Sequence, residues 1–402
     1  MKRDLMHVLA ALLAAVIALA GFGVRHFYRA SHQAEQKKLK IGFVLDGDDS
    51  TAYTANFMHA VNQLTAYFGS RIETTERFQV PYEAAERVIG ALVDDGCGMI
   101  VTNSYGYCEA AKRAAERYPS VQFCQATGDN ANTAPVLPNY HTFMGRIAEG
   151  RYACGVVAGR KLAAMIESGE ITAEEAVIGY VAAFPVPEVI SGYTAFLLGA
   201  RSQCPEAVMR VRYTNTWSDY ADEKRAAEKL ILAGCRLIAQ HSDTIGPALV
   251  CENTAIGYRV YHVGYNRDMT DVAPTASLIS ARTDWSPYLI AAAEAILSDG
   301  RIENFAGASV HGNDAGGGFA EGWVSLFQLN EAAVPSDCDA LLRETVQALK
   351  EGKVQIFSGE YTGVDPNDAS DVYDLRTPYP ENAVSSAPTF HYVLRDVITV
   401  DT

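Results

Sequence analysis

The chain has 402 residues, of which 49% are hydrophobic and 20% charged, and this composition is typical of a globular protein and excludes a disordered one. Single hydrophobic cores stop growing beyond about 250–300 residues, so two lobes or domains are expected. The formal net charge of −15 disfavours nucleic-acid polymers and anionic membrane surfaces as partners, because Lys and Arg make most contacts to phosphate.

The N-terminus carries the pattern of an export signal. Lys2 and Arg3 precede an apolar run over 5–24, and Arg25 follows it. About twenty apolar residues suffice for a helix that crosses a membrane. We therefore predict an extracytoplasmic protein in which 1–37 is an N-terminal apolar helix and stalk attached to the cell membrane. The alternative is cleavage near Ala20, which would release a secreted or periplasmic protein.

The cysteines predict neither a structural metal site nor a defined set of disulfides. No Cys-x-x-Cys pair occurs, and no His accompanies the cysteines at the spacing of zinc ligands. An exported protein can oxidise its cysteines, so disulfides stay open. Several of the eight stand in apolar runs, where Cys also serves as a small core residue. They are Cys97, Cys108, Cys124, Cys154, Cys204, Cys235, Cys251 and Cys338.

From residue 39 onward, short apolar runs alternate with amphipathic stretches. Such alternation predicts parallel sheets with helical right-handed crossovers, that is, an α/β fold. The first series of strand and helix candidates covers 39–45, 55–68, 83–93, 99–102, 108–117 and 121–126. The pattern then restarts over 177–181, 191–202, 208–213, 221–232, 237–240 and 258–265. We therefore predict two doubly wound parallel-sheet lobes.

The two series repeat one local pattern. Gly96-Cys97 and Gly234-Cys235 each follow the end of a predicted helix and open an apolar strand. The first of these strands runs into Asn103-Ser104-Tyr105, and the second into Gln240-His241-Ser242-Asp243. Ligands of open parallel sheets bind beyond the carboxyl ends of the strands. Two such sheets facing each other would place both polar clusters on one cleft.

No catalytic motif is present. The sequence has no Gly-x-Ser-x-Gly, no His-Glu-x-x-His and no phosphate-binding glycine loop. Asp46, Asp48 and Asp49 follow the first strand, but they lack the other ligands of a cation site, and we interpret them as a solvated loop. His241 and Asp243 could form a general base and its partner, yet no nucleophile lies near them in sequence. We predict no enzyme, no cofactor and no metal; a nucleoside hydrolase is the enzymatic alternative.

Aromatic residues give a stronger signal. Each of them lies just past a strand end, and an aromatic ring in such a loop is exposed unless a flat ligand or the lobe's own core covers it. Several at equivalent strand ends favour a cleft that stacks on its ligand. The residues are Tyr53, Tyr105, Tyr107, Phe184, Trp217, Tyr265 and Trp285.

Several stretches together resemble one family. They are Gly150-Arg151-Tyr152 through Gly159, the run from Ile178 to Val189, Ala195-Phe196 through Arg201, Asn215-Thr216-Trp217, Gln240-His241-Ser242-Asp243, Gly264-Tyr265-Asn266-Arg267-Asp268-Met269 and Trp285-Ser286-Pro287-Tyr288. In this respect the chain resembles the basic-membrane-protein family of ABC-transporter substrate-binding proteins, the purine-nucleoside-receptor-like group. The resemblance covers about 38–365.

This resemblance implies a type I periplasmic-binding fold whose lobes are joined by a hinge of three crossings. It places lobe 1 at 38–145 plus 266–310, lobe 2 at 146–265 plus 311–360, and a segment wrapping the hinge at 361–402. It also implies a monomer that binds a purine nucleoside or free purine base and partners the permease subunits of an ABC importer. A membrane-bound sensor, or a binder of another heterocycle or a sugar, is the alternative function.

The resemblance also suggests the ligand contacts. Tyr53 and Trp217 stand where the family places its stacking aromatics in the two lobes. Asn266 and Glu109 stand where nucleoside binders often have Asp, which leaves a free base open as the ligand. The predicted ligand-binding set is Tyr53, Thr54, Asn103, Ser104, Tyr105, Tyr107, Phe184, Trp217, His241, Asp243, Tyr265, Asn266, Asp268 and Trp285.

Overall fold

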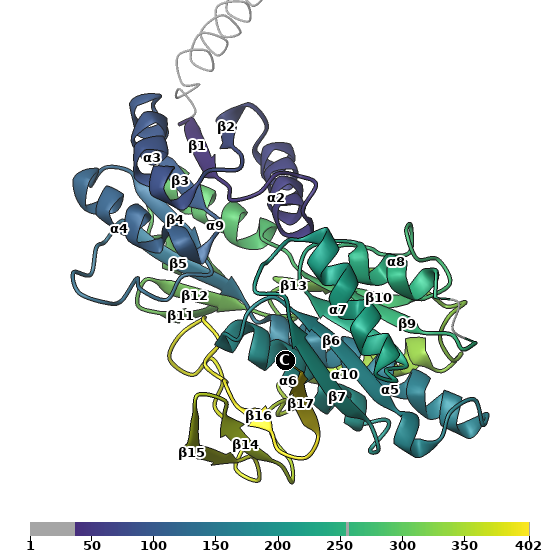
Figure 1. The fold of residues 1–402 in the computed structure, drawn as a ribbon. Helices are drawn as coiled ribbons and strands as arrows, with labels where there is room; N and C mark the ends of the chain where they lie inside the picture. The colour runs from purple at the N-terminus through teal and green to yellow at the C-terminus, as the bar shows by residue number, and fades with distance from the viewer. Residues whose placement is uncertain (1–36, 255–256, 402) are drawn as a thin grey trace, which may run out of the picture. The chain divides into compact units, whose positions relative to one another are not determined.

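The computed structural model describes residues 37–254 and 257–401. The chain divides after Lys38, and the helices and strands of the described residues all belong to the unit Leu39–Thr402. The predicted N-terminal helix lies outside the described residues. Within the described part, no helix combines the length and the apolar character that crossing a membrane requires. The unit Leu39–Thr402 contains two lobes, each built on a seven-stranded sheet (Figure 1).

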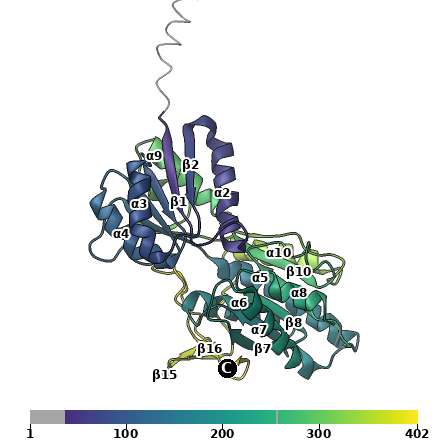
Figure 2. The same cartoon turned by 45° about the horizontal axis from the view of Figure 1, so that its top comes forward.

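The first sheet has the strand order β11-β12-β5-β4-β3-β1-β2, and all neighbours are parallel except β11 and β12. Helices α2 and α9 pack on one face, and α3 and α4 on the other (Figure 2). Strands β1, β3, β4 and β5 are almost wholly buried because helices cover both faces. The elements are β1 (Leu39–Val44), α2 (Ala52–Phe68), β2 (Ile72–Arg77), α3 (Ala85–Asp94), β3 (Met99–Thr102), α4 (Cys108–Arg117), β4 (Gln122–Ala126), β5 (Tyr140–Gly145), α9 (Ser286–Leu297), β11 (Ser309–His311) and β12 (Asp314–Gly317).

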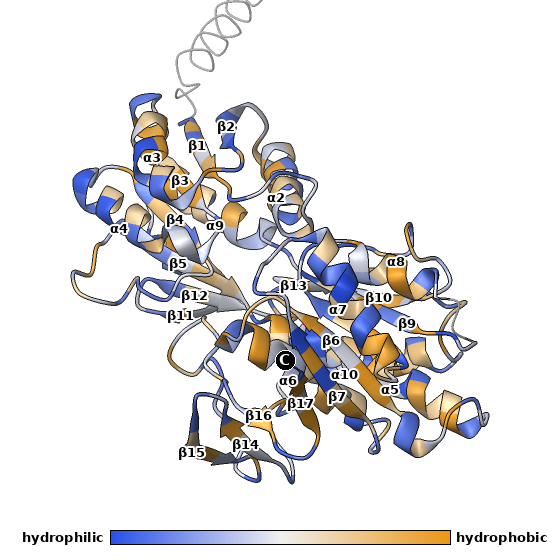
Figure 3. Ribbon diagram, viewed as in Figure 1, coloured by the Kyte–Doolittle hydropathy of each residue, from blue (hydrophilic) through white to orange (hydrophobic). Residues whose placement is uncertain are grey.

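The second sheet has the order β13-β10-β9-β8-β6-β7-β17, and only β13 is antiparallel to its neighbour. Helices α5 and α6 cover one face, α7 and α8 the other, and α10 packs on α5. Helices such as α3 and α5 carry both hydrophilic and hydrophobic stretches (Figure 3). The elements are α5 (Ile147–Glu167), β6 (Val177–Ala182), α6 (Pro187–Arg201), β7 (Val208–Tyr213), α7 (Tyr220–Leu232), β8 (Leu237–His241), α8 (Gly246–Glu252), β9 (Tyr261–Tyr265), β10 (Ser277–Thr283), β13 (Val324–Leu326), α10 (Cys338–Lys350) and β17 (Ile398–Asp401).

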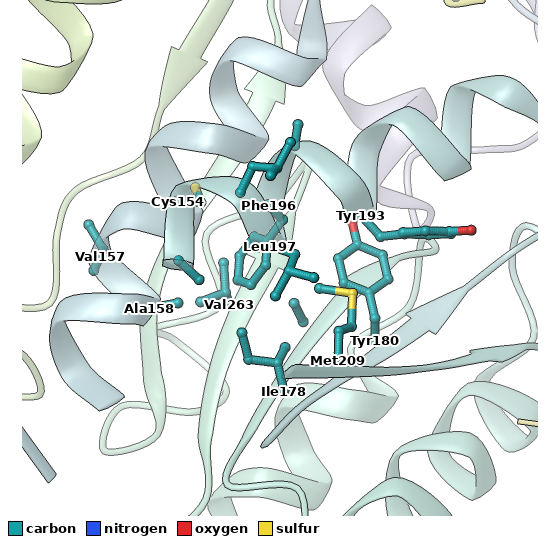
Figure 4. Packing of buried hydrophobic residues seen from close by; sticks show 14 of the residues in the cluster. Cys154, Val157, Ala158, Ile178, Tyr180, Tyr193, Phe196, Leu197, Met209 and Val263 are labelled. Atoms are coloured by element: carbon teal, nitrogen blue, oxygen red, sulfur yellow. The ribbon is translucent and has the colours of Figure 1, made fainter. Parts of the chain in front are cut away.

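Glycines allow α5 and α6 to pack with their backbones in close contact. A Cβ atom on Gly155 would lie 2.0 Å from the carbonyl oxygen of Phe196, and one on Gly199 would lie 2.1 Å from that of Tyr152. No side chain fits at such a separation. The neighbouring core, with Phe196 and Leu197 of α6 beside Cys154 of α5, is shown in Figure 4.

All eight cysteines are free thiols and all are buried. Cys154 belongs to the core between α5 and α6, Cys97 to the core of the first lobe, and Cys235 to the core beneath α7. Their interpretation as small core residues is confirmed, and the disulfide alternative is removed.

The chain passes between the sheets three times, after β5, after β10 and after β12. The predicted boundaries at 266 and 311 need correction. Strand β10 pairs in parallel with β9, so the chain stays in the second lobe until Thr283. Strand β12 pairs with β5, so the first lobe extends to Gly317. The boundaries that the resemblance implied place both crossings too early in the chain, because β10 still belongs to the second sheet and β12 still belongs to the first.

An ion-pair network ties the first and third crossings together. The guanidinium of Arg146 donates to Glu149 at 2.9 Å and to Glu321 at 2.7 Å. The two carboxylates in turn accept from the backbone N–H groups of Phe319 and Gly318, each at 2.7 Å. The first and third crossings are therefore bonded to each other at this point.

The C-terminal segment contacts both sheets. Strand β17 extends the second sheet parallel to β7. Strands β14 (Thr362–Asp365), β15 (Asp368–Asp374) and β16 (Val393–Leu394) form a separate three-stranded antiparallel sheet. Ser386 lies between β15 and β16 in the chain and makes two hydrogen bonds to the buried Asp314 of β12. Its backbone N–H donates one, and its hydroxyl donates the other at 2.6 Å. The segment 361–402, predicted to wrap the hinge, is thus bonded to the first sheet as well as the second.

Candidate ligand-binding site

A cavity of about 550 Å³ lies where the carboxyl ends of the two sheets meet. Its walls come from the residues that follow β1, β2, β3 and β4 in the first lobe and β6, β7, β8 and β9 in the second. This is the position at which open parallel sheets bind ligands, and the volume suits a small molecule. The lining residues are Asp46, Gly47, Thr51, Tyr53, Gln79, Val80, Pro81, Tyr82, Glu83, Asn103, Ser104, Tyr105, Thr127, Phe184, Glu188, Asn215, Thr216, Trp217, Ser218, Asp243, Tyr265 and Asn266.

Aromatic side chains from both lobes line the cavity. In the second lobe, Phe184 and Trp217 meet edge to face, with ring centroids 5.4 Å apart. In the first lobe, Tyr53 on α2 contacts the edge of Phe57, and its hydroxyl donates to the carbonyl oxygen of Asn103. These contacts fix the orientation of the rings. The cavity therefore offers preorganised aromatic surfaces for a flat ligand.

Asp46 and Asn103 form a reciprocal pair on the wall of the first lobe. The side-chain amide of Asn103 donates to Asp46 at 2.9 Å, and its oxygen accepts from the backbone N–H of Asp46 at 3.0 Å. Burial raises the pKa of Asp46, while the bonds from Asn103 and Ser104 oppose that rise. The pair presents a hydrogen-bond acceptor to the cavity at the end of β1.

Two further carboxyl groups line the wall of the second lobe. Burial raises the pKa of Glu188 to about 7, and the Arg151 charge opposes the rise. Burial also raises the pKa of Asp243 well above its ordinary value, and the neighbouring charges of Glu223, Asp46 and Glu188 add to the effect. The cavity therefore contains several carboxyl groups, and a ligand that donates N–H or O–H hydrogen bonds to them would stabilise them.

A buried cation lies behind this wall. The guanidinium of Arg151 is fully buried, lies 3.7 Å from the ring centroid of Tyr265 and donates to the carbonyl oxygen of Gln240 at 2.9 Å. His241 also packs against Tyr265, edge to face, with ring centroids 4.6 Å apart. Burial, followed by the Arg151 charge, lowers the pKa of His241 well below its ordinary value, so the imidazole is neutral. The ring of Tyr265, which lines the cavity, is thus in direct contact with the buried guanidinium of Arg151.

The two lobes touch at one edge of the cavity. The side-chain amide of Asn56 on α2 donates to Oδ1 of Asn266 at 2.9 Å. Asn266 has a φ of +58°, and its buried Nδ2 has no hydrogen-bond partner among the described residues. A buried donor without a partner is costly, so a ligand acceptor placed there would be favoured. Asn215 and Thr127, which also line the cavity, have φ values of +57°, and such strained backbone is common at functional sites.

Nine of the fourteen predicted binding residues line the cavity. They come from both lobes and include the two predicted stacking rings. The nine are Tyr53, Asn103, Ser104, Tyr105, Phe184, Trp217, Asp243, Tyr265 and Asn266.

The other five predicted residues do not line this cavity as the described residues form it. Thr54 follows Tyr53 on α2 and is fully buried, because successive helix residues point in different directions. His241 is fully buried behind Tyr265. Asp268 accepts from the backbone N–H of Thr270 at 2.9 Å instead.

The last two are core aromatics. The hydroxyl of Tyr107 donates to the carbonyl oxygen of Val80, and its side chain is fully buried. Trp285 stacks on Phe57 with ring centroids 4.7 Å apart and is 2% exposed. For these two residues the alternative interpretation, packing in the lobe's own core, is the right one.

Several lining residues were missed. Asp46 was interpreted as part of a solvated loop, although it directly follows the first strand and the strand-end rule applies to it. Glu188 stands in the first turn of α6, inside the run from Ile178 to Val189 that carries the family resemblance, but it was not singled out as a ligand contact. The stretch 79–83 follows β2, whose polar sequence Ile-Glu-Thr-Thr-Glu-Arg gave no strand signal. Because β2 was not predicted, the residues that follow it were not predicted to line the cavity.

Comparisons with known proteins bear on this site. A family model described as ABC transporter substrate-binding protein, PnrA-like, matches residues 38–316, more than two thirds of the chain. The chain belongs to this family. A purine-binding protein of Brucella abortus (strain 2308) is 31% identical to this PnrA-like protein over 332 residues, which cover 82% of this chain and 85% of that protein.

Two further proteins resemble this PnrA-like chain. A protein of Haloferax volcanii, provisionally named an ABC transporter glucose-binding protein, is 36% identical over 217 residues, 54% of this chain and 50% of that protein. The solved structure of an ABC transporter solute-binding protein from Conexibacter woesei DSM 14684 superposes with a TM-score of 0.60 at 19% identity, covering 79% of this chain and 97% of that chain. The second likeness concerns the fold alone, and it confirms the predicted α/β fold of periplasmic binding proteins.

Membership of the PnrA-like family establishes the general function. The protein is a substrate-binding protein of an ABC transporter, and such proteins bind a small molecule outside the cytoplasm and work with permease subunits. The family is one of binding proteins and not of enzymes.

Proposed function

We propose that this PnrA-like protein binds a purine, as a free base or a nucleoside, in the cavity between the lobes and delivers it to an ABC importer without chemical change. The observation that carries the proposal is the 31% identity, across 82% of the chain, to a protein named as purine-binding. In this proposal the protein acts as a monomer.

The chemistry of the cavity supports a purine. Tyr53 and Trp217 supply aromatic faces from opposite lobes, and stacking on an aromatic ring contributes roughly 1–3 kcal/mol per base. Asp46, Glu188 and Asp243 can accept hydrogen bonds from ring N–H and amino groups. The unpartnered amide of Asn266 can donate to a ring nitrogen or a carbonyl oxygen. Two stacking faces with two or three buried hydrogen bonds suffice for micromolar affinity, about −8 kcal/mol.

Binding to the closed form explains how one ligand could hold the lobes together. A ligand that touches both lobes stabilises the closed state only through its higher affinity for that state. Rings and carboxyl groups lie on both walls, so a purine placed between them loses its contacts to one wall when the lobes separate. The short crossings after β5, β10 and β12 allow such a hinge motion.

Glucose is the second candidate, because a relative over half of the chain is provisionally named a glucose-binding protein. Carboxylates and a tryptophan face also suit a sugar. The cavity of this protein, however, has no Arg in its described lining and carries aromatic residues in both lobes. We therefore rank the purine first and use glucose as the decisive competitor.

Thermal-shift assays with adenine, guanine, hypoxanthine, their nucleosides and glucose test the ligand class, because a ligand that binds only the folded state raises the melting temperature. At least one purine should stabilise the protein, and calorimetry should then give one site per chain. Stabilisation by glucose and by no purine would replace the proposal with a sugar. Identification by mass spectrometry of a ligand that copurifies with the protein provides an independent check.

A matched pair of substitutions tests the site. Asp243→Asn removes a carboxylate from the lining, whereas Asp268→Asn makes the same change outside it. Loss of one buried hydrogen-bond partner costs about 1–3 kcal/mol, so Asp243→Asn should weaken binding by roughly 5- to 150-fold. Asp268→Asn should leave the affinity unchanged. Equal effects of the two substitutions would place the ligand elsewhere.

We further propose that the apolar run 5–24 keeps the protein at the cell membrane. The run is long enough to span a hydrocarbon core, and no Cys follows it for lipid attachment. Fractionation of cells that express the full chain should recover it with the membranes. Recovery of a soluble form beginning at Gly21 would instead show cleavage.

A further inference from the structure

The small C-terminal sheet brings together three potential metal ligands that the ligand cavity does not use. Asp365 ends β14, Asp371 lies in β15, and His391 stands two residues before β16. One ligand atom from each residue lies within 4.8 Å of the others. The cluster lies outside the residues 38–316 that the family model matches, so membership of the family does not account for it.

The separations within the cluster fit ligands around an ion better than ligands bonded to one another. Nε2 of His391 lies 3.8 Å from Oδ2 of Asp365 and 3.7 Å from Oδ2 of Asp371. Both distances exceed the 2.7–3.2 Å of an N–H···O hydrogen bond. A cation in the plane of the three atoms and equidistant from them would lie at most about 2.4 Å from each, a limit that admits the 2.0–2.2 Å of zinc bonds to nitrogen and oxygen.

Neighbouring groups orient the imidazole and one of the carboxylates. Nδ1 of His391 lies 2.8 Å from the carbonyl oxygen of Thr389, and a proton on Nδ1 leaves the lone pair of Nε2 directed at the two carboxylates. The hydroxyl of Tyr392 donates to Oδ1 of Asp371 at 3.0 Å and leaves Oδ2 facing His391. In most metal-binding histidines the second ring nitrogen likewise donates to a carbonyl or carboxylate oxygen, which fixes the tautomer and the orientation of the ring.

Glu381 holds the loop that carries the histidine. Its carboxylate accepts from the backbone N–H and the hydroxyl of Thr389, each at 3.0 Å, and from the backbone N–H of Phe390 at 2.9 Å. The ring of His391 also stacks on Tyr392, with centroids 4.3 Å apart. The His391 side chain is therefore fixed before any ion binds, which lowers the entropic cost of binding.

We propose that Asp365, Asp371 and His391 bind a divalent transition-metal ion, zinc above all, and that the ion holds the three strands of the C-terminal sheet together. One nitrogen and two carboxylate ligands suit zinc, whereas calcium prefers oxygen ligands alone. Water would complete the coordination, since the side chains of Asp371 and His391 are 44% and 32% exposed. No sequence motif marks this site, because its ligands come from three separate stretches of the chain and none of them is Cys.

A metal would meet a structural need. The three strands have only four, seven and two residues, and most of β15 is exposed. Sheets this small are marginally stable alone and are often held by a metal or a disulfide. The same segment carries Ser386, which is bonded to Asp314 of the first sheet. The ion would thus stabilise the element that connects the C-terminal sheet to both lobes.

Zinc binding by the full-length chain, stripped with a chelator and measured by equilibrium dialysis, tests the proposal. The parent should bind one more zinc ion than His391→Ala and Asp371→Asn, whose affinity at this site should fall at least about 100-fold. His311→Ala, which removes a partly exposed imidazole on β11, is the matched control and should bind as the parent does. Asp371→Asn keeps the size of the side chain and guards against a folding defect in the other variant.

Two further measurements complete the test. Zinc should slow proteolysis within 361–402 in the parent and in His311→Ala but not in the other variants. Cobalt substituted for zinc should show the weak visible absorption of nitrogen and oxygen ligands. Equal zinc stoichiometry and affinity in all variants, no binding by the parent at micromolar concentrations, or an intense sulfur-to-cobalt band would overturn the proposal. Purine or glucose binding in the lobe cavity should be the same in every variant, so the result is independent of the proposed ligand.

Discussion

Replacing Trp217 with alanine removes one aromatic wall of the cavity and distinguishes a ligand contact from a core residue. The indole is partly buried, lies 5.4 Å from Phe184 and 6.3 Å from His241 between ring centroids, and packs on the edge of the second lobe's core. Loss of one stacking face costs roughly 1–3 kcal/mol per base. The dissociation constant for the purine should therefore rise roughly 5- to 150-fold.

The effect of the same substitution on folding should be smaller. A fully buried aromatic residue truncated to alanine costs about 3–5 kcal/mol, and the partly exposed Trp217 should cost about half of that. Trp323→Ala is the matched control, because Trp323 is 1% exposed, packs on Tyr288 at 5.4 Å and does not line the cavity. That variant should lose about 3–5 kcal/mol of stability, while its folded fraction binds with the parent's affinity.

Isothermal titration calorimetry gives the affinity, and urea denaturation without ligand gives the free energy of unfolding. The two variants should show opposite profiles, with weak binding for Trp217→Ala and weak folding for Trp323→Ala. If Trp217→Ala is as unstable as Trp323→Ala and still binds with the parent's affinity, then Trp217 is a core residue. The proposed stacking site would then be wrong.

Three further predictions concern pH, packing and the C-terminal segment. The pKa of Glu188 is raised from 4.5 to about 7, so its protonated form stabilises the unliganded fold below pH 4.5, and this stability is lost as the pH rises through 7. The loss of stability is at most about 3 kcal/mol, and water reduces it because the Glu188 side chain is 24% exposed. Glu188→Gln should flatten the dependence of the unfolding free energy on pH. An unchanged dependence would contradict this prediction. Gly199→Ala should lower the stability by about 1–3 kcal/mol or more in thermal denaturation, because the new Cβ would lie 2.1 Å from the carbonyl oxygen of Tyr152. Gly90→Ala is the control: its Cβ would have its nearest neighbour at 3.5 Å, and the change should be neutral or stabilising by about 0.5–1 kcal/mol. Asp314→Ala leaves Ser386 and Thr142 without their acceptor and should expose 361–402 to limited proteolysis while both lobes stay folded; resistance equal to the parent's would show that the contact is dispensable.

The alternation of apolar and amphipathic stretches predicted many of the strands and helices of the two sheets, but it missed the buried strands β5 and β10. The predicted helix over 108–117 coincides with α4, and the predicted strands over 99–102 and 208–213 coincide with β3 and β7. These elements are buried on one or both faces, so burial imposes a strong pattern on their sequence. Strands β2 and β15 were not predicted, because edge strands rich in polar residues carry little of that pattern.

The sequence also indicated the position of the cavity, since residues that follow strand ends in a parallel sheet meet at one edge. It did not determine the direction of each side chain. Tyr53 lines the cavity and the adjacent Thr54 does not, because a helix turns by about 100° per residue. Trp285 stands at a strand end like the other aromatics, yet it packs on Phe57 within the core.

By itself the sequence determined the fold class, the two-lobe organisation and the family, because burial patterns and motif order are local properties of the chain. Only the tertiary structure decided which groups meet. Asn56 and Asn266 are 210 residues apart and share a hydrogen bond, and Asp365 and His391 come together only through the pairing of β14 with β15 and β16. Such contacts between distant residues depend on strand pairing and lobe closure, and sequence spacing carries no record of either.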